Sequence, residues 1–119
     1  MLVIVATPAL AGLEGFIKGL SDSGAEVVHA RSGMAALEMA KVRAPVLLVV
    51  GGDIPDFRPF ELVSALTRVN AAINSAVMSP LTSEQFHEDS EGLGILTQIA
   101  PHPGEKDALD VMAKLMRIL

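Results

Sequence analysis

The chain has 119 residues, of which half are apolar and 19% are charged. This composition excludes a disordered chain and supplies enough material for one hydrophobic core. Fourteen acidic and nine basic residues give a net charge of −5, which disfavours contact with nucleic acid or an anionic membrane surface. Because there is no cysteine, disulfides, thiolate nucleophiles and cysteine-based zinc sites are excluded.

Residues 2–11 (LVIVATPALA) superficially resemble a signal peptide. No basic residue precedes them, however, and Thr7-Pro8 interrupts the apolar run. No apolar run approaches the roughly 20 residues that a membrane-spanning helix needs. We therefore interpret this segment as a first strand and expect a cytoplasmic protein with no membrane contact.

Two uninterrupted apolar runs, Leu2–Ala6 and Val46–Val50, are rich in β-branched residues. Continuous apolarity of this length is typical of parallel strands that are covered on both faces. Three less apolar segments predict further strands at residues 25–29, 74–79 and 94–98.

Helical spacing of apolar residues predicts helices between these strands. The first is expected over residues 9–21, beginning after Thr7-Pro8 and closed by Gly24. Thr82 and Gln85 offer a capping box for a short fourth helix, which Gly92 ends. The remaining helices are expected at residues 33–42, after Pro59 to about residue 69, and at 105–119.

Strand and helix thus alternate strictly, which indicates a parallel sheet with right-handed crossovers. The most apolar strands, the first and third, belong at the centre. We predict one α/β domain over residues 1–119: a three-layer, flavodoxin-like sandwich with a five-stranded parallel sheet of order 2-1-3-4-5 and a short fourth helix. A functional site is expected where the carboxyl ends of the strands meet.

Two segments make the chain resemble a known family. Gly24–Leu37 (GAEVVHARSGMAAL) and Ala44–Leu62 (APVLLVVGGDIPDFRPFEL) are similar to the receiver (CheY-like) domains of the response regulators in bacterial two-component signalling. In that family a cluster of carboxylates holds Mg²⁺, and one Asp accepts a phosphoryl group. The resemblance extends over essentially the whole chain and implies the same fold.

The residues that carry the family's chemistry are largely replaced. Ala6 and Thr7 stand where the acidic pair belongs, and Gly51 stands where the resemblance places the phosphoacceptor Asp, four residues before Pro55. Ser79 fills the switch Ser/Thr position, and Gln98 stands at that of the phosphate-binding Lys. Ile95 replaces the switch aromatic residue. The resemblance therefore implies a degenerate pseudo-receiver that is not phosphorylated and holds no metal.

Other readings of these residues find less support. Asp53 lies two residues beyond Gly51, about 6 to 7 Å further along an extended strand, and is a poor substitute acceptor. Gly51-Gly52 before a helix can approach a phosphate, but no P-loop lysine accompanies it, so a structural turn is favoured. His87 among acidic residues is typical of a solvated helix end. His29 and His102 lack the partners of a catalytic triad.

We expect no enzymatic activity and no cofactor. The leading hypothesis is a non-catalytic signalling domain that acts through protein–protein contact. The alternative is a sensor whose small-molecule ligand occupies the emptied pocket above Ala6, Thr7, Gly51 and Ser79. Gly52, Asp53 and Ile95 are candidate contacts for either a ligand or a protein partner.

The last helix offers a candidate interface. Its apolar residues form two seams, whereas packing on one sheet face requires one. The surplus seam comprises Leu109, Met112, Met116 and Leu119. We expect it to pair with a protein partner or a second copy of the chain, together with the fifth-strand face.

Overall fold

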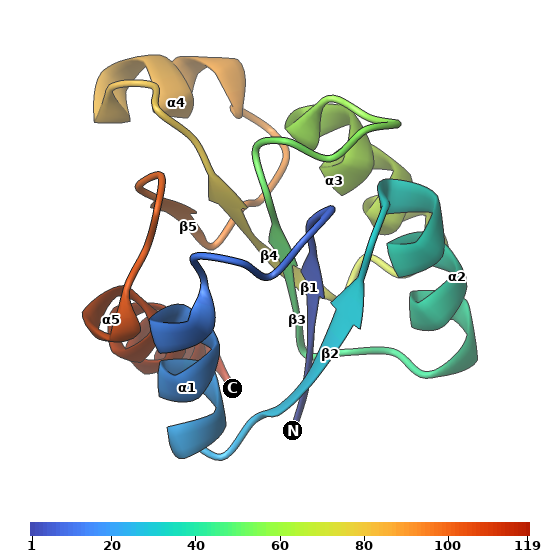
Figure 1. Ribbon diagram of the computed structural model, residues 1–119. Coiled ribbons are helices and arrows are strands. Elements are labelled where there is room, and N and C mark those ends of the chain that lie inside the picture. Colours follow the sequence, from blue (N-terminus) through green and yellow to red (C-terminus); the bar gives the residue numbers. More distant parts are fainter.

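A computed structural model describes residues 1–119 as ten alternating strands and helices (Figure 1). No helix is both long and apolar enough to span a membrane. The elements are β1 (Leu2–Ala6), α1 (Glu14–Asp22), β2 (Glu26–Ala30), α2 (Gly33–Val42), β3 (Leu47–Val50), α3 (Pro59–Val69), β4 (Asn74–Met78), α4 (Ser83–Asp89), β5 (Thr97–Ile99) and α5 (Glu105–Ile118).

The five strands form one parallel sheet of order β2-β1-β3-β4-β5, which confirms the predicted flavodoxin-like topology. Every residue of β1 and β3 is buried, as their continuous apolar sequences require. Because all strands run the same way, their carboxyl ends share one edge of the sheet (Figure 1).

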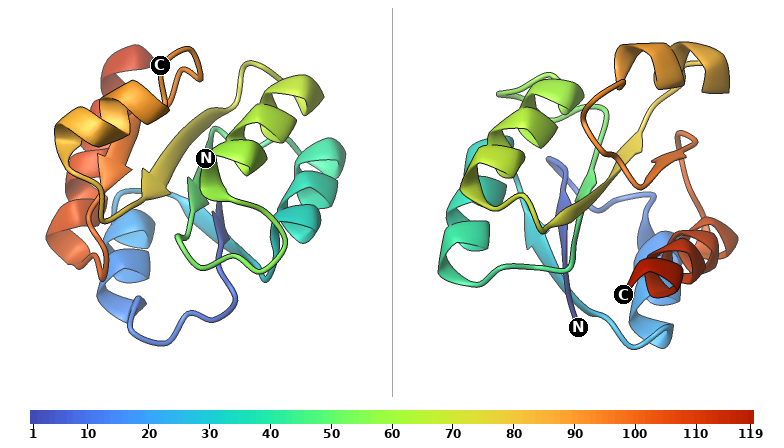
Figure 2. Two further views of the ribbon diagram at one scale, coloured as in Figure 1. Left: turned by 90° about the horizontal axis from the view of Figure 1, so that it is seen from above. Right: turned by 180° about the vertical axis from the view of Figure 1, so that it is seen from behind.

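Helices cover the sheet on both faces (Figures 1 and 2). On one face α1 and α5 lie side by side over a core that includes Val5, Phe16 and Leu115. On the other face α2 and α3 cover a second core around Ile4, Leu48 and Leu62. The short α4 joins this second core through its own Phe86, whose ring meets that of Phe60 edge-on at 5.3 Å.

The first helix was predicted to begin at Ala9, and this was wrong. Gly12 adopts a left-handed conformation (φ +85°), so residues 9–13 form a loop and α1 begins at Glu14. The Thr7 hydroxyl does not cap the helix but donates to Ala9 O at 3.2 Å. Gly24, also left-handed (φ +95°), follows the end of α1 as expected.

The fifth strand was also misplaced: β5 comprises Thr97–Ile99 and not residues 94–98. Gly94 has a φ of +67°, which is incompatible with an extended strand, and strand pairing begins only at Thr97, opposite Ala76. The other boundaries differ from the prediction by no more than one residue, except in α4, for which only the capping signal was predicted.

Of the two hydrogen bonds in the capping box predicted for α4, the structure confirms one. Thr82 Oγ1 accepts a hydrogen bond from Gln85 N at 3.1 Å. The Gln85 side chain does not return to Thr82 but donates to Asp89 Oδ1 at 2.7 Å, one turn further along the helix.

The start of α2 is fastened to the loop that follows β3. Asp56 Oδ1 accepts from Gly33 N at 2.8 Å and Oδ2 accepts from Met34 N at 2.9 Å, while Ser32 Oγ accepts from Ala35 N at 3.1 Å. The first three N–H groups of α2 are therefore all satisfied by side chains. Hydrogen bonds from Met34 and Gly33 hold the pKa of Asp56 below its ordinary value.

Replacing Asp56 by Ala should lower the free energy of unfolding by about 1 kcal/mol near neutral pH, because two N–H groups lose their acceptor. A carboxyl whose pKa is lower in the folded state than in the unfolded state stabilises the fold at pH values above its ordinary pKa. This contribution is lost as the pH falls through the pKa of the folded state. The difference between wild type and Asp56→Ala in urea unfolding should thus shrink below about pH 4. A difference that does not change with pH would contradict the role of this carboxylate.

Candidate functional site

The carboxyl edge of the sheet brings together three of the residues singled out in the sequence. Thr7 follows β1, Gly51 follows β3 and Ser79 follows β4. Their backbone N–H groups extend the ladders by donating to Ala30 O, Ala6 O and Ile99 O at 2.9, 2.8 and 2.9 Å. All three residues are buried, so their positions are determined by the sheet itself.

No side chain fits at Gly51 without rearrangement. A Cβ built on Gly51 would lie 2.9 Å from Ala6 O, 3.2 Å from Thr7 Cβ and 3.2 Å from Asp53 Oδ1. The nearest of these atoms belongs to the backbone of the neighbouring strand, which cannot move aside as a flexible side chain would. Glycine at this position therefore permits a close approach of β3 to β1.

A cleft of about 460 Å³ opens at this edge, where the loops after β1 and β3 diverge. It is lined by Thr7, Gly52, Asp53 and Met78, by the loop between β1 and α1, and by Pro101 and His102 beyond β5. Ala6, Gly51 and Ser79 do not line it. Of the four residues expected around the emptied pocket, only Thr7 lines the cleft.

Few polar side chains face this cleft. Thr7 is 2% exposed, and its hydroxyl lies 3.2 Å from Ala9 O and 3.5 Å from Asp53 Oδ1. Thr7 O lies 2.7 Å from His29 Nε2, which must carry the proton in this hydrogen bond because a carbonyl only accepts. This contact ties the loop after β1 to the edge strand β2. Asp53 is exposed and forms no ion pair.

Ser79 and Gln98 face a separate hollow on the side of α4 and β5. Ser79 Oγ accepts from Leu81 N at 3.2 Å, and Gln98 Nε2 donates to Ser79 O at 3.1 Å and to Leu81 O at 2.7 Å. The Gln98 amide therefore holds the loop after β4. A third hollow lies between this loop and the start of α3, and all three hollows meet at Pro80.

The remaining candidate residues lie away from the cleft. Ile95 is half-buried and packs against the core beneath α2 and α3. On α5, Leu109 and Met116 are 48% and 49% exposed, and Leu119 follows the helix in an exposed position. Met112 is 2% exposed and belongs to the opposite core, so its assignment to an exposed interface was wrong. The reason is that α5 is rotated so that Met112 faces α1 and the sheet.

The residues at the edge do not fit the magnesium site that the resemblance implies. Mg²⁺ is held by carboxylates in a near-octahedral arrangement, and Ala6, Thr7 and Gly51 supply none. Asp53 is the only carboxylate that lines the cleft. No three His, Asp or Glu side chains in the chain lie close enough together to hold a metal ion.

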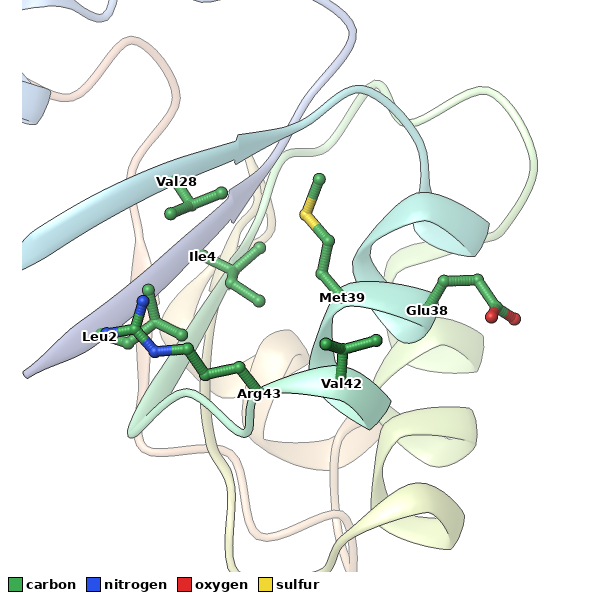
Figure 3. A pocket seen from close by; sticks show the side chains of 7 residues that line it. All are labelled: Leu2, Ile4, Val28, Glu38, Met39, Val42 and Arg43. Atoms are coloured by element: carbon green, nitrogen blue, oxygen red, sulfur yellow. The ribbon is translucent and has the colours of Figure 1, made fainter.

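A fourth hollow, of about 420 Å³, lies at the other end of the sheet between the strands and α2 (Figure 3). Leu2, Ile4 and Val28 face Met39 and Val42 across it, while Glu38 points away. Arg43 at its rim is held by two hydrogen bonds of 2.8 and 2.9 Å to the Glu26 carboxylate. No free polar group points into this groove, so it has little to orient a ligand.

Sequence reasoning missed the contribution of the loop after β5. Pro101 and His102 border the cleft, and His102 is the one residue other than glycine with a positive φ (57°). The signal available was the sequence Pro101-His102-Pro103 just before the last helix, since prolines on both sides restrict the backbone of the residue between them.

Comparison with solved structures places this architecture among response-regulator receiver domains. The chemotaxis response regulator CheY4 of Vibrio cholerae has a TM-score of 0.81 and 18% identity, with 99% of this chain and 98% of that chain covered. The signal receiver domain of the putative response regulator NarL of Mycobacterium tuberculosis has a TM-score of 0.81 and 19% identity, with 98% of this chain and 95% of that chain covered.

The receiver domain of Francisella response regulator 1452 is equally similar, with a TM-score of 0.83, 16% identity and coverage of 99% and 98%. No protein-family model and no curated protein matches the chain in sequence. The chain therefore has the CheY-like receiver fold over its whole length, and at this level of identity the likeness extends to the fold alone.

Proposed function

We propose that residues 1–119 form one receiver-like signalling domain that is not phosphorylated and acts through contact with other proteins. The observation that carries this proposal is Gly51. The resemblance places the phosphoacceptor here, yet the residue has no side chain and a Cβ would lie 2.9 Å from Ala6 O. A carboxylate at this position would require β1 or β3 to shift.

Asp53 does not replace the missing acceptor in this proposal. It is exposed in the loop, and its carboxylate accepts one long hydrogen bond, from Thr7 Oγ1 at 3.5 Å. A phosphoacceptor needs a metal ion and a cation beside it to offset the charge of the phosphoryl group. No Lys or Arg lines the cleft around Asp53.

The proposed contact surface is the exposed side of α5. Leu109 and Met116 are two helical turns apart, so they lie on one face, and Ala113 between them is exposed as well. Lys114, on a different side of the helix, donates to Thr97 Oγ1 at 3.1 Å and ties α5 to β5. Apolar side chains grouped on a helix surface favour association with a protein partner or a second copy of the chain.

The wild-type chain should form dimers at high concentration, and the double variant Leu109→Glu/Met116→Glu should remain monomeric because the charges cannot be buried at the contact. Multi-angle light scattering over a concentration series measures this directly. The matched control is Val42→Glu/Met34→Glu, which changes two exposed apolar residues of α2 and should leave association unchanged. A strictly monomeric wild type would argue against self-association.

The cleft favours a second function, in which the domain senses a small molecule. Its volume of about 460 Å³ lies within the range of small-molecule sites, and apolar walls surround a few polar groups. In open α/β sheets, ligands bind beyond the carboxyl ends of the strands where the strand order reverses. The cleft lies at this point, between the loops after β1 and β3.

A further inference from the structure

The side chains that face the cleft offer hydrogen-bond acceptors and few donors. The Thr7 hydroxyl has one hydrogen, and its nearer acceptor is Ala9 O at 3.2 Å, so Thr7 Oγ1 presents lone pairs to the cleft. The Asp53 carboxylate only accepts. Pro80 and Pro101, which also line the cleft, have no backbone N–H. The His102 imidazole is the one other side chain lining the cleft that carries a hydrogen-bond donor. A bound molecule that brings its own donors therefore suits Thr7 and Asp53.

The charges around the cleft favour a cation over an anion. No Lys or Arg lines it, and Asp53 forms no ion pair within the chain. The start of α1 borders the cleft through Leu13, and a helix start by itself attracts anions. Glu14 in the first turn of α1 offsets that attraction with its own carboxylate. Arg58 lines the adjoining hollow beside α3 and not the cleft.

The walls of the cleft are apolar and its mouth is conformationally strained. Ala11, Leu13 and Met78 give it an aliphatic surface. His102 at the border is held with a φ of 57°, a conformation that costs energy for a residue with a side chain. Such strain occurs preferentially at ligand sites.

We infer that the cleft binds a small organic cation, with a primary ammonium group at Asp53 and Thr7 and an apolar body against Leu13 and Met78. This inference rests on the second function proposed above, because it names the class of ligand for that sensing site. The ammonium has three N–H donors for the Thr7 hydroxyl and the Asp53 carboxylate. Its positive charge also pairs with Asp53, which has no ion-pair partner within the chain. Asp53 is exposed, so its attraction should be modest and should weaken with added salt.

The test uses three probes that share one apolar body and differ in charge: benzylamine, benzyl alcohol and benzoate. Each is titrated into the full chain while backbone amide resonances are followed by NMR. We expect saturable shifts around Gly52, Asp53 and His102, with benzylamine binding about fivefold more tightly than benzyl alcohol. Benzoate should bind most weakly. Asp53→Asn should remove the preference for the amine, whereas Glu91→Gln, an equal change of charge on an exposed residue after α4, should retain it.

The outcomes separate the ligand class from the sensing function. Saturable binding in the cleft without a preference for benzylamine, or with benzoate favoured, would overturn the cationic ligand while leaving a small-molecule site in place. If none of the three probes shifts the amides of the cleft, both the cationic ligand and the sensing function fail. A preference for benzylamine that survives in Asp53→Asn would overturn the role of this carboxylate.

Discussion

Gly19→Ala should lower the free energy of unfolding by about 2 kcal/mol, even though alanine is the better helix former. Gly19 lies where α1 crosses the start of α5. A Cβ there would lie 2.7 Å from Ala108 Cβ and 2.8 Å from Glu105 O. Because the second atom belongs to the backbone of α5, the two helices would have to separate. Equilibrium unfolding in urea measures the change.

Gly15→Ala is the matched control, since Gly15 lies one turn earlier on the same side of α1. A Cβ at Gly15 would meet only Glu105 N, at an ordinary 3.5 Å. Both substitutions reduce the flexibility of the unfolded chain equally, so that effect cancels in the comparison. Gly15→Ala should be neutral or slightly stabilising. Equal unfolding free energies for the two variants would contradict the close crossing of α1 and α5.

The triple variant Ala6→Asp/Thr7→Asp/Gly51→Asp should lose about 3–5 kcal/mol of stability in the absence of metal. Ala6 and Thr7 are 0% and 2% exposed, so their carboxylates would be buried without a partner. A Cβ at Gly51 also crowds Ala6 O. A Cβ at Gly51 would lie 3.2 Å from Thr7 Cβ, whereas the Ala6 side chain belongs to the core beneath α2 and α3. The carboxylates at positions 7 and 51, with that at position 6 at the same edge, should bind Mg²⁺ and regain part of the lost stability.

Gly51→Asp alone is the control, and it should be destabilised by about 1–3 kcal/mol without any response to Mg²⁺. The readout is urea unfolding with and without the metal, supported by calorimetric titration of Mg²⁺. A folded triple variant that is indifferent to Mg²⁺ would show that the receiver-like geometry does not extend to this edge. Stabilisation of the wild type by Mg²⁺ would contradict the assignment of a degenerate site.

The topology could be predicted from the sequence because its strongest signals are local. The apolar runs of β1 and β3 and the glycine after α1 each determine structure within a few residues. The errors arose where local signals were misleading. Thr7-Pro8 looks like a helix start, but Gly12 turns the chain before α1 begins. The apolar residues around Ile95 look like a strand, but pairing with β4 begins only at Thr97.

The candidate site was less predictable because it is assembled from distant segments. Gly51 and Thr7 could be placed at the edge by counting from the strands, and the structure brings them together. The roles of Asp56 and Gly19 depend on contacts with α2 and α5, which periodicity does not reveal. The border of the cleft at His102 depends on the path of the loop after β5. Met112 was misassigned because two apolar seams on one helix do not show which of them faces the core.

The most direct test of a receiver fold without phosphorylation is intact-mass spectrometry after incubation with acetyl phosphate and Mg²⁺. A receiver domain that retains its acceptor Asp serves as the positive control. We predict that the mass of this chain stays unchanged, because Gly51 offers no acceptor and the cleft has no cluster of carboxylates to hold Mg²⁺. An addition of one phosphoryl group that hydroxylamine removes, and that is absent from Asp53→Asn, would contradict the account and make Asp53 the acceptor.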